Sequence, residues 1–196
     1  MELFRYFQNS EFAEDLCTGI VSFALLSLYT DSENSEQLGS ARYDEQEGRV
    51  NTLDSFGTTS HKVFSNPTRI LCFATKLDQK LEDEFGRYIV RLTDADKFGS
   101  LLSKALENQP YKIGDLRHQL VNYTDEPIAA ADYEFIHSQC FTKPQKYSNQ
   151  MEYRYVFVEK DDLSNVISGN SKLPNPLRRE IRLPKLELNG LFEQIK

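Results

Sequence analysis

Two polar side chains, Gln150 and Glu152, stand two positions apart where a polar stretch gives way to the apolar run 153–158. Residues two apart on an extended chain point the same way, so both side chains are expected to share one face. That face is either a solvent-exposed strand end or the edge of a cleft. In a cleft, the Glu152 carboxylate could stabilise positive charge that develops in a transition state.

Two further polar residues accompany apolar strands. Arg5 lies in the predicted strand 3–7, which is otherwise Leu, Phe and Tyr, and a guanidinium there needs an anionic partner or an exposed position. Thr75 follows the apolar run 70–74. Each also fits an ordinary structural role, an ion pair for Arg5 and the end of a strand for Thr75.

The order of these residues resembles the Arg–Ser–Glu pattern of ADP-ribosyltransferases. Arg5 stands on the first core strand, Thr75 at a middle strand, and Gln150 and Glu152 enter a late strand. The resemblance implies that Glu152 is catalytic and stabilises an oxocarbenium-like transition state. It implies that Gln150 assists the acceptor of the ADP-ribose.

The same resemblance implies that NAD is bound as a substrate, without a metal. Arg5 would anchor the NAD phosphates, Thr75 would support the nicotinamide ribose, and Tyr6 or Tyr147 would form a stacking wall. The chain departs from the pattern at one point, because Ala74 stands where the strand Ser is expected and Thr75 points to the other face. An alternative is therefore a protein that keeps the fold and a nucleotide-sized cleft but only binds.

A broader resemblance spans residues 5–154. The chain looks like an uncharacterised group of bacterial and phage proteins that share several short motifs. In this sequence the motifs are Arg5-Tyr6-Phe7, Gly19-Ile20-Val21, the acidic segment 42–48, Cys72-Phe73-Ala74, Phe141-Thr142-Lys143 and Gln150-Met151-Glu152-Tyr153-Arg154.

A different class of function stays open beside these. The acidic segment 31–47 is expected to be a solvated connection, or the surface through which a non-enzymatic phage or mobile-element protein docks on a host protein. A third option, a metal-dependent hydrolase, would use Asp44, Glu45 and Glu47. Their spacing is not that of a calcium loop, so we expect no structural metal there.

The composition limits the classes of binding partner and the cellular compartment that are expected for this protein. The chain has 196 residues and a net charge of -7, which disfavours general nucleic-acid binding. No stretch approaches the roughly 20 apolar residues of a membrane span, and the N-terminus lacks the layout of a signal peptide. The three cysteines are far apart, without a Cys-x-x-Cys pair, and are expected to be reduced thiols in a cytoplasmic protein.

Hydrophobic periodicity predicts the elements that carry these residues. Helices and strands are mixed without strict alternation, which favours one α+β domain over residues 1–196, with a mixed, largely antiparallel sheet and flanking helices. The resemblance described above implies that this fold is similar to that of ADP-ribosyltransferases. The expected strands are 3–7, 20–23, 70–75, 87–92, 111–114, 117–123, 153–158 and 179–183, with a hairpin of 49–54 and 61–65. The expected helices are 11–18, 78–85, 95–107 and 129–140, and residues 184–196 are expected to form a tail.

Overall fold

The structure is a computed structural model that describes eight stretches of the chain. They are 1–26, 49–63, 68–109, 114–132, 139–159, 180–183, 185–188 and 190–195. The α-helices are α1 (Ser10–Cys17), α3 (Gln79–Phe85) and α4 (Ala95–Glu107), and the 3-10 helices are η3 (Ala130–Asp132) and η4 (Gln145–Gln150). The strands are β1 (Leu3–Phe7), β2 (Ser22–Leu25), β3 (Arg49–Leu53), β4 (Thr59–Val63), β5 (Thr68–Ala74), β6 (Tyr88–Leu92), β7 (Arg117–Leu120), β8 (Asn122–Tyr123), β9 (Ile128–Ala129), β10 (Thr142–Lys143), β11 (Glu152–Val158), β12 (Glu180–Arg182) and β13 (Phe192–Gln194).

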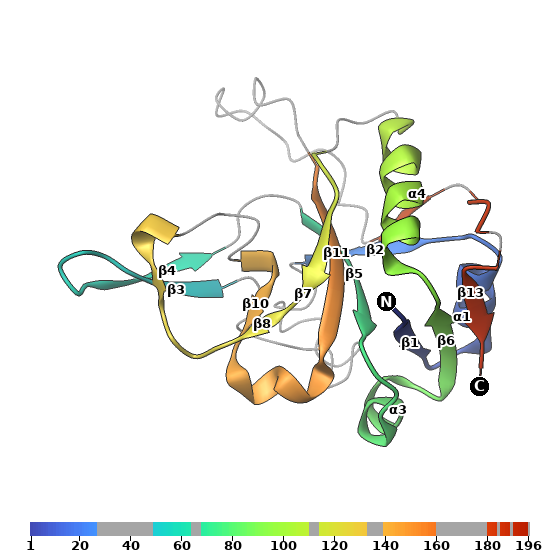
Figure 1. Cartoon of the computed structure of the whole chain (residues 1–196), viewed down its shortest axis with the longest axis horizontal. Coiled ribbons are helices and arrows are strands. Elements are labelled where there is room, and N and C mark those ends of the chain that lie inside the picture. The colour runs from blue at the N-terminus through green and yellow to red at the C-terminus, as the bar shows by residue number, and fades with distance from the viewer. Residues whose placement is uncertain are drawn as a thin grey trace.

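An eight-stranded antiparallel sheet forms the body of the molecule (Figure 1). Its main path runs β12-β2-β5-β1-β6-β13, while β11 pairs with the other side of β5 and carries β7 on its own far side. The pairing of β5 with β11 covers all seven residues of both strands, from Thr68 opposite Val158 to Ala74 opposite Glu152. This long pairing brings the late strand that begins with Glu152 beside the middle strand that ends with Ala74.

Apolar side chains on one face of the sheet form the main core together with α1 and α4. Phe73 and Tyr155 from neighbouring strands pack edge to face against each other, and Phe98 of α4 packs against both. Leu16 of α1 belongs to the same core. A smaller cluster joins Phe4 and other β1 side chains to α3.

Local sequence signals mark the start of α3, the start of α4 and the end of α3. Asp78 and Asp94 cap α3 and α4, because their carboxylates accept hydrogen bonds from backbone N–H groups in the first turn, at 2.9 and 3.0 Å. Gly86 ends α3 with a φ of +125°, and a Cβ there would lie 2.1 Å from the carbonyl oxygen of Phe7. Only glycine permits this turn from α3 into β6.

Two small sheets stand beside the main one. The hairpin β3–β4, with β9 parallel to β3, extends away from the body in Figure 1. A parallel pair of β8 and β10 lies near the start of β11. These parallel contacts and the antiparallel main sheet confirm the predicted α+β class with a largely antiparallel sheet. Among the described helices, none is both long and apolar enough to cross a membrane.

Four predicted elements differ from the structure. The predicted strand 117–123 is divided into β7 of the main sheet and β8 of a small sheet. The predicted helix over 129–140 is not formed at its start, because Ala129 ends β9 and 130–132 make a single 3-10 turn; residues 133–138 lie outside the described residues. The predicted tail 184–196 contains β13, which pairs with β6 and extends the sheet. The second strand begins at Ser22, two residues later than predicted.

Candidate functional site

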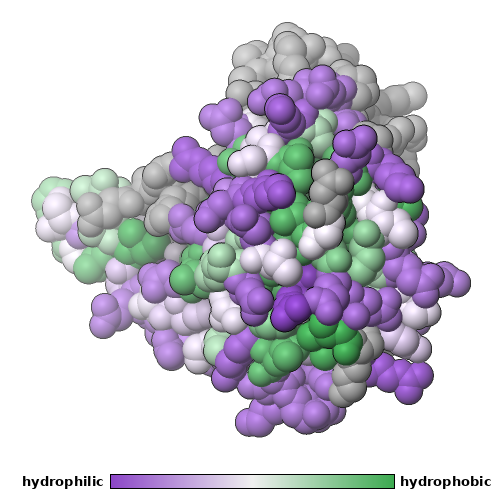
Figure 2. All heavy atoms as spheres, turned by 45° about the vertical axis from the view of Figure 1, so that its right-hand side comes forward, coloured by the Kyte–Doolittle hydropathy of each residue, from purple (hydrophilic) through white to green (hydrophobic). Residues whose placement is uncertain are grey.

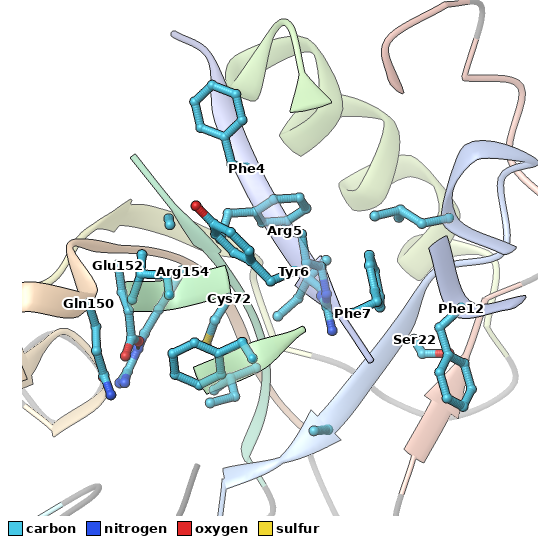
Figure 3. A pocket seen from close by; sticks show the side chains of 18 of the residues that line it. Phe4, Arg5, Tyr6, Phe7, Phe12, Ser22, Cys72, Gln150, Glu152 and Arg154 are labelled. Atoms are coloured by element: carbon cyan, nitrogen blue, oxygen red, sulfur yellow. Dashed lines mark hydrogen bonds and ion pairs between the residues drawn. The ribbon is translucent and has the colours of Figure 1, made fainter. Parts of the chain in front are cut away.

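A cavity of about 380 Å³ lies at the junction of β1, β5, β11 and α1. Its walls are mainly apolar, and Arg5, Lys143, Gln150, Glu152 and Arg154 add polar groups to them. Figure 3 shows the heads of Gln150, Glu152 and Arg154 gathered on one side, with Phe12 and Ser22 on the opposite side. Strands from both ends of the sequence therefore meet at one hollow.

The cavity occupies a gap in the main sheet. Both β2 and β1 pair with the same side of β5, β2 at Arg69 and Ile70 and β1 at Ala74. No strand that the structure describes pairs with Leu71–Phe73 on that side. The separation of β1 from β2 opens the sheet at this point. The cavity is therefore lined from both faces of the sheet, by residues of α1 and by residues of α3.

A buried cluster of charges lies at the polar side. The Lys143 ammonium donates to Oε1 of Glu152 at 2.9 Å, and Nε of Arg154 donates to Oε2 of the same carboxylate at 2.7 Å. Lys143 also donates to Oε1 of Gln150 at 2.8 Å, and Arg154 donates to the carbonyl of Cys140 at 2.7 Å. The side chains of Lys143, Glu152 and Arg154 are 6%, 12% and 1% exposed.

These ion pairs determine the ionisation of Glu152. Burial by itself would raise the pKa of the carboxyl group. The charges of Arg154 and Lys143, with their hydrogen bonds, outweigh burial and lower the pKa of Glu152 from 4.5 to about 2. Glu152 is thus a permanent anion at neutral pH, and two cations share its charge.

The small β8–β10 sheet positions Glu152 from outside the main sheet. Tyr123 and Lys143 are register partners in this sheet, and the Tyr123 hydroxyl accepts a hydrogen bond of 2.9 Å from the backbone N–H of Glu152. Burial, and next the Glu152 charge, raise the pKa of Tyr123. Tyr123, Lys143 and Arg154 were not among the residues predicted for the site. The alternation of Glu152 and Arg154 on one strand was the signal that could have found the arginine.

Arg5 enters the cavity from the other side of the gap. Its guanidinium carbon lies 5.3 Å from the ring centre of Phe7 and 5.7 Å from that of Phe73. Both distances are within the range of cation–π attraction. The two rings hold the guanidinium against an apolar wall of the cavity.

Four of the six predicted site residues line this cavity: Arg5, Tyr6, Gln150 and Glu152. The Tyr6 hydroxyl turns toward α3, where it accepts a hydrogen bond of 2.9 Å from the N–H of Asp78. Thr75 is not in the lining, and its N–H donates to the carbonyl of Met151. Tyr147 is also outside the lining, with its ring centre 4.8 Å from the Lys143 ammonium.

The reason predicted for the shared direction of Gln150 and Glu152 is wrong. Gln150 is not on a strand but ends the 3-10 helix η4, and Met151 has a left-handed backbone with a φ of 43°. Glu152 then begins β11. Both side chains reach the cavity because the chain turns at Met151, and not because an extended chain alternates.

The other candidate sites that the sequence suggested have less structural support. The acidic segment 31–47, with Asp44, Glu45 and Glu47, lies outside the described residues. Within the described stretches, no group of three or more His, Cys, Asp or Glu residues is placed to hold a metal ion. Cys17, Cys72 and Cys140 are free thiols, and of the three only Cys72 lines the cavity.

No family model, curated protein or solved structure matches this chain. The cavity is therefore interpreted from its own geometry.

Proposed function

We propose that the protein binds a small organic anion in the cavity between β1, β5 and β11, with NAD as the first candidate ligand. One observation carries this proposal: Arg5, Lys143 and Arg154 line the same apolar-walled cavity. A concave apolar site with a few convergent polar groups is the usual form of a small-molecule site, and its volume of about 380 Å³ suits such a ligand.

The charges favour an anion over a cation. The whole chain carries a net charge of -7, yet the lining of this cavity has three basic side chains (Arg5, Lys143 and Arg154) against two acidic ones (Asp15 and Glu152), a net charge of +1. The Arg5 guanidinium lies over the rings of Phe7 and Phe73. A planar guanidinium can bind a phosphate or carboxylate through two parallel hydrogen bonds, and an ammonium cannot. NAD supplies both phosphates and rings.

Titration calorimetry with NAD tests the proposal. We expect saturable binding that weakens at least tenfold in Arg5→Lys, which keeps the charge but loses the planar fork. Arg87→Lys is the matched control, because Arg87 also lies over an aromatic ring, that of Tyr88, but is not in the cavity lining. The control is expected to bind like the wild type.

Thiol labelling gives an independent measurement at the same site. Cys72 lines the cavity and is half-buried, whereas Cys17 is half-buried elsewhere. NAD at saturation is expected to slow the labelling of Cys72 and to leave that of Cys17 unchanged. Equal labelling of Cys72 with and without NAD, together with no heat of binding, would reject NAD as the ligand.

A second candidate function is ADP-ribosyl transfer on an ADP-ribosyltransferase-like fold. The observation that favours it is the presence of Arg5, Gln150 and Glu152 around one cavity. In that reaction the bond between nicotinamide and ribose breaks, the acceptor bonds to the ribose carbon, and the acceptor releases a proton. A carboxylate would stabilise the cationic transition state. Because Lys143 and Arg154 share the Glu152 charge, the geometry supports binding more directly than transfer.

Release of nicotinamide from NAD separates the two candidates. Transfer or hydrolysis predicts free nicotinamide in amounts that exceed the protein, and a tenfold or larger loss in Glu152→Asp, which keeps the charge but withdraws the carboxylate. If the protein only binds NAD, neither the wild type nor Glu152→Asp is expected to release nicotinamide, and both are expected to retain affinity for NAD.

A further inference from the structure

Apolar side chains from three separate clusters meet at the cavity. Phe73 and Leu16 belong to the main core, Phe4 and Leu81 to the cluster under α3, and Ile70 to a third cluster on the far end of β5. Each of these side chains also lines the cavity. The ligand that fills this space therefore contacts hydrocarbon over most of its surface.

Three polar side chains of the wall, Gln150, Glu152 and Arg154, are gathered on one side, while Arg5 and Asp15 of α1 add charges elsewhere in the lining. In Figure 3 the heads of Gln150, Glu152 and Arg154 lie on one side, and the ring of Phe12 lies on the opposite side. Phe12 is 46% exposed, so this ring borders the opening to solvent. Figure 2 likewise shows hydrophobic side chains that reach the surface of the body between hydrophilic ones. The cavity thus has its cluster of polar side chains opposite the Phe12 ring.

We propose that the ligand is an amphiphilic anion, a carboxylate or phosphate whose uncharged part is an alkyl or aryl group rather than a sugar. This inference rests on the general form of the proposed function, anion binding in the cavity, and it ranks such an anion ahead of NAD, which carries two riboses. The anionic group lies near the basic side chains and the apolar group lies against Phe4, Leu16 and Phe12.

Hydroxyl groups explain why an apolar wall disfavours a sugar. Each hydroxyl that leaves water for an apolar wall loses hydrogen bonds that the wall does not replace. A methylene group in the same place gains from burial. The free energy for burying one methylene corresponds to a roughly fourfold gain in affinity.

A homologous series of carboxylates tests the inference. Butyrate, hexanoate, octanoate and decanoate carry the same charge and differ only in buried hydrocarbon. We expect affinity, measured by calorimetry, to rise roughly fourfold per methylene until the cavity is full, and then to level off. Of the two aryl carboxylates, 4-phenylbutyrate is expected to bind more tightly than phenylacetate, and equal affinities for the two would count against the inference.

Two phenylalanines provide a matched pair of variants. Phe12 lines the cavity, whereas Phe56, at the tip of the β3–β4 hairpin, is 92% exposed and not in the lining. Phe12→Ser is expected to weaken octanoate about fivefold or more. Phe56→Ser is expected to leave octanoate binding unchanged, and unfolding curves check that both variants fold.

The results separate this inference from the proposed function. Binding of NAD or inorganic phosphate, with affinity for the carboxylates independent of chain length, overturns the inference and leaves anion binding intact. Equal effects of Phe12→Ser and Phe56→Ser also overturn it. Failure of NAD, phosphate and all carboxylates to bind overturns both.

Discussion

Arg5 and Glu152 line one cavity although their side chains leave opposite faces of the sheet. Ala74 is the register partner of both Phe4 and Glu152, so these three residues share a row on one face. Arg5 follows Phe4 and points to the other face, where it contacts Phe73 of the main core. The two charges meet the same space because the sheet is open between β1 and β2.

Because of this gap, residues whose side chains alternate between the two faces of the sheet can line the same cavity. In a continuous sheet, side chains on opposite faces cannot share a ligand. Here the cavity passes through the gap beside Leu71–Phe73, and residues of both faces line it. A single ligand can therefore contact Arg5 from one face and the row of Ala74 from the other.

Glu152→Gln is expected to lower the free energy of unfolding by about 3–5 kcal/mol, because it removes the carboxylate that buried Lys143 and Arg154 share. Glu193→Gln is the control, since Glu193 pairs with Arg91 but is 55% exposed. An exposed ion pair contributes less than about 1 kcal/mol. Urea unfolding measures both values, and similar small losses in the two variants would contradict the buried cluster.

Acid is expected to destabilise the protein through Glu152. Its pKa is lowered in the folded state, so the stability from its ionised form is present above the ordinary pKa of 4.5 and lost as pH falls toward about 2. The lowering of the Glu152 pKa from 4.5 to about 2 corresponds to about 3 kcal/mol of the free energy of unfolding. Urea midpoints across this pH range measure it. Glu152→Gln lacks this component, and identical pH profiles for the two proteins would refute the assignment.

If NAD is the ligand, Ala74→Ser is expected to strengthen its binding roughly two- to tenfold. The new hydroxyl would stand in the cavity lining, in the row of Phe4 and Glu152, and one net hydrogen bond contributes about 0.5–1.5 kcal/mol. Thr75→Ser is the control, because Thr75 is outside the lining. Calorimetry compares them. An effect of Thr75→Ser equal to that of Ala74→Ser would argue against a ligand beside Ala74.

Gly99→Ala is expected to destabilise the protein by about 1–3 kcal/mol, although Ala is the better helix former. A Cβ at this position of α4 would lie 2.5 Å from Nε2 of His118. The His118 ring cannot move aside easily, because it stacks on Tyr155 and its Nδ1 lies 2.6 Å from the Tyr153 hydroxyl. Thermal unfolding tests this, and a second change, His118→Ala, is expected to relieve the clash. A higher melting temperature for Gly99→Ala alone would disprove the contact.

Local patterns in the sequence determined most of the elements. Hydrophobic periodicity predicted the strand β6, the apolar run 70–74 predicted β5, and the expected helices 78–85 and 95–107 agree closely with α3 and α4. These features depend on residues a few positions apart, so the sequence contains the whole physical cause. Prediction was wrong over 129–132, where a short strand and a 3-10 turn replace a helix.

The site depended on contacts that local patterns do not contain. The sequence pointed to Arg5, Gln150 and Glu152 but not to Lys143, which reaches Glu152 from β10 and makes it a buried ion pair. The sequence also allowed Glu152 to lie at a solvent-exposed strand end, where its substitution would hardly change the stability of the protein.

Only the tertiary structure decided between these interpretations. Ion pairing and the gap in the sheet arise where β5 pairs with β11, some eighty residues later in the chain, and where β1 and β2 share one side of β5. Such long-range pairing is set by the packing of the whole core, and no short stretch of sequence specifies it.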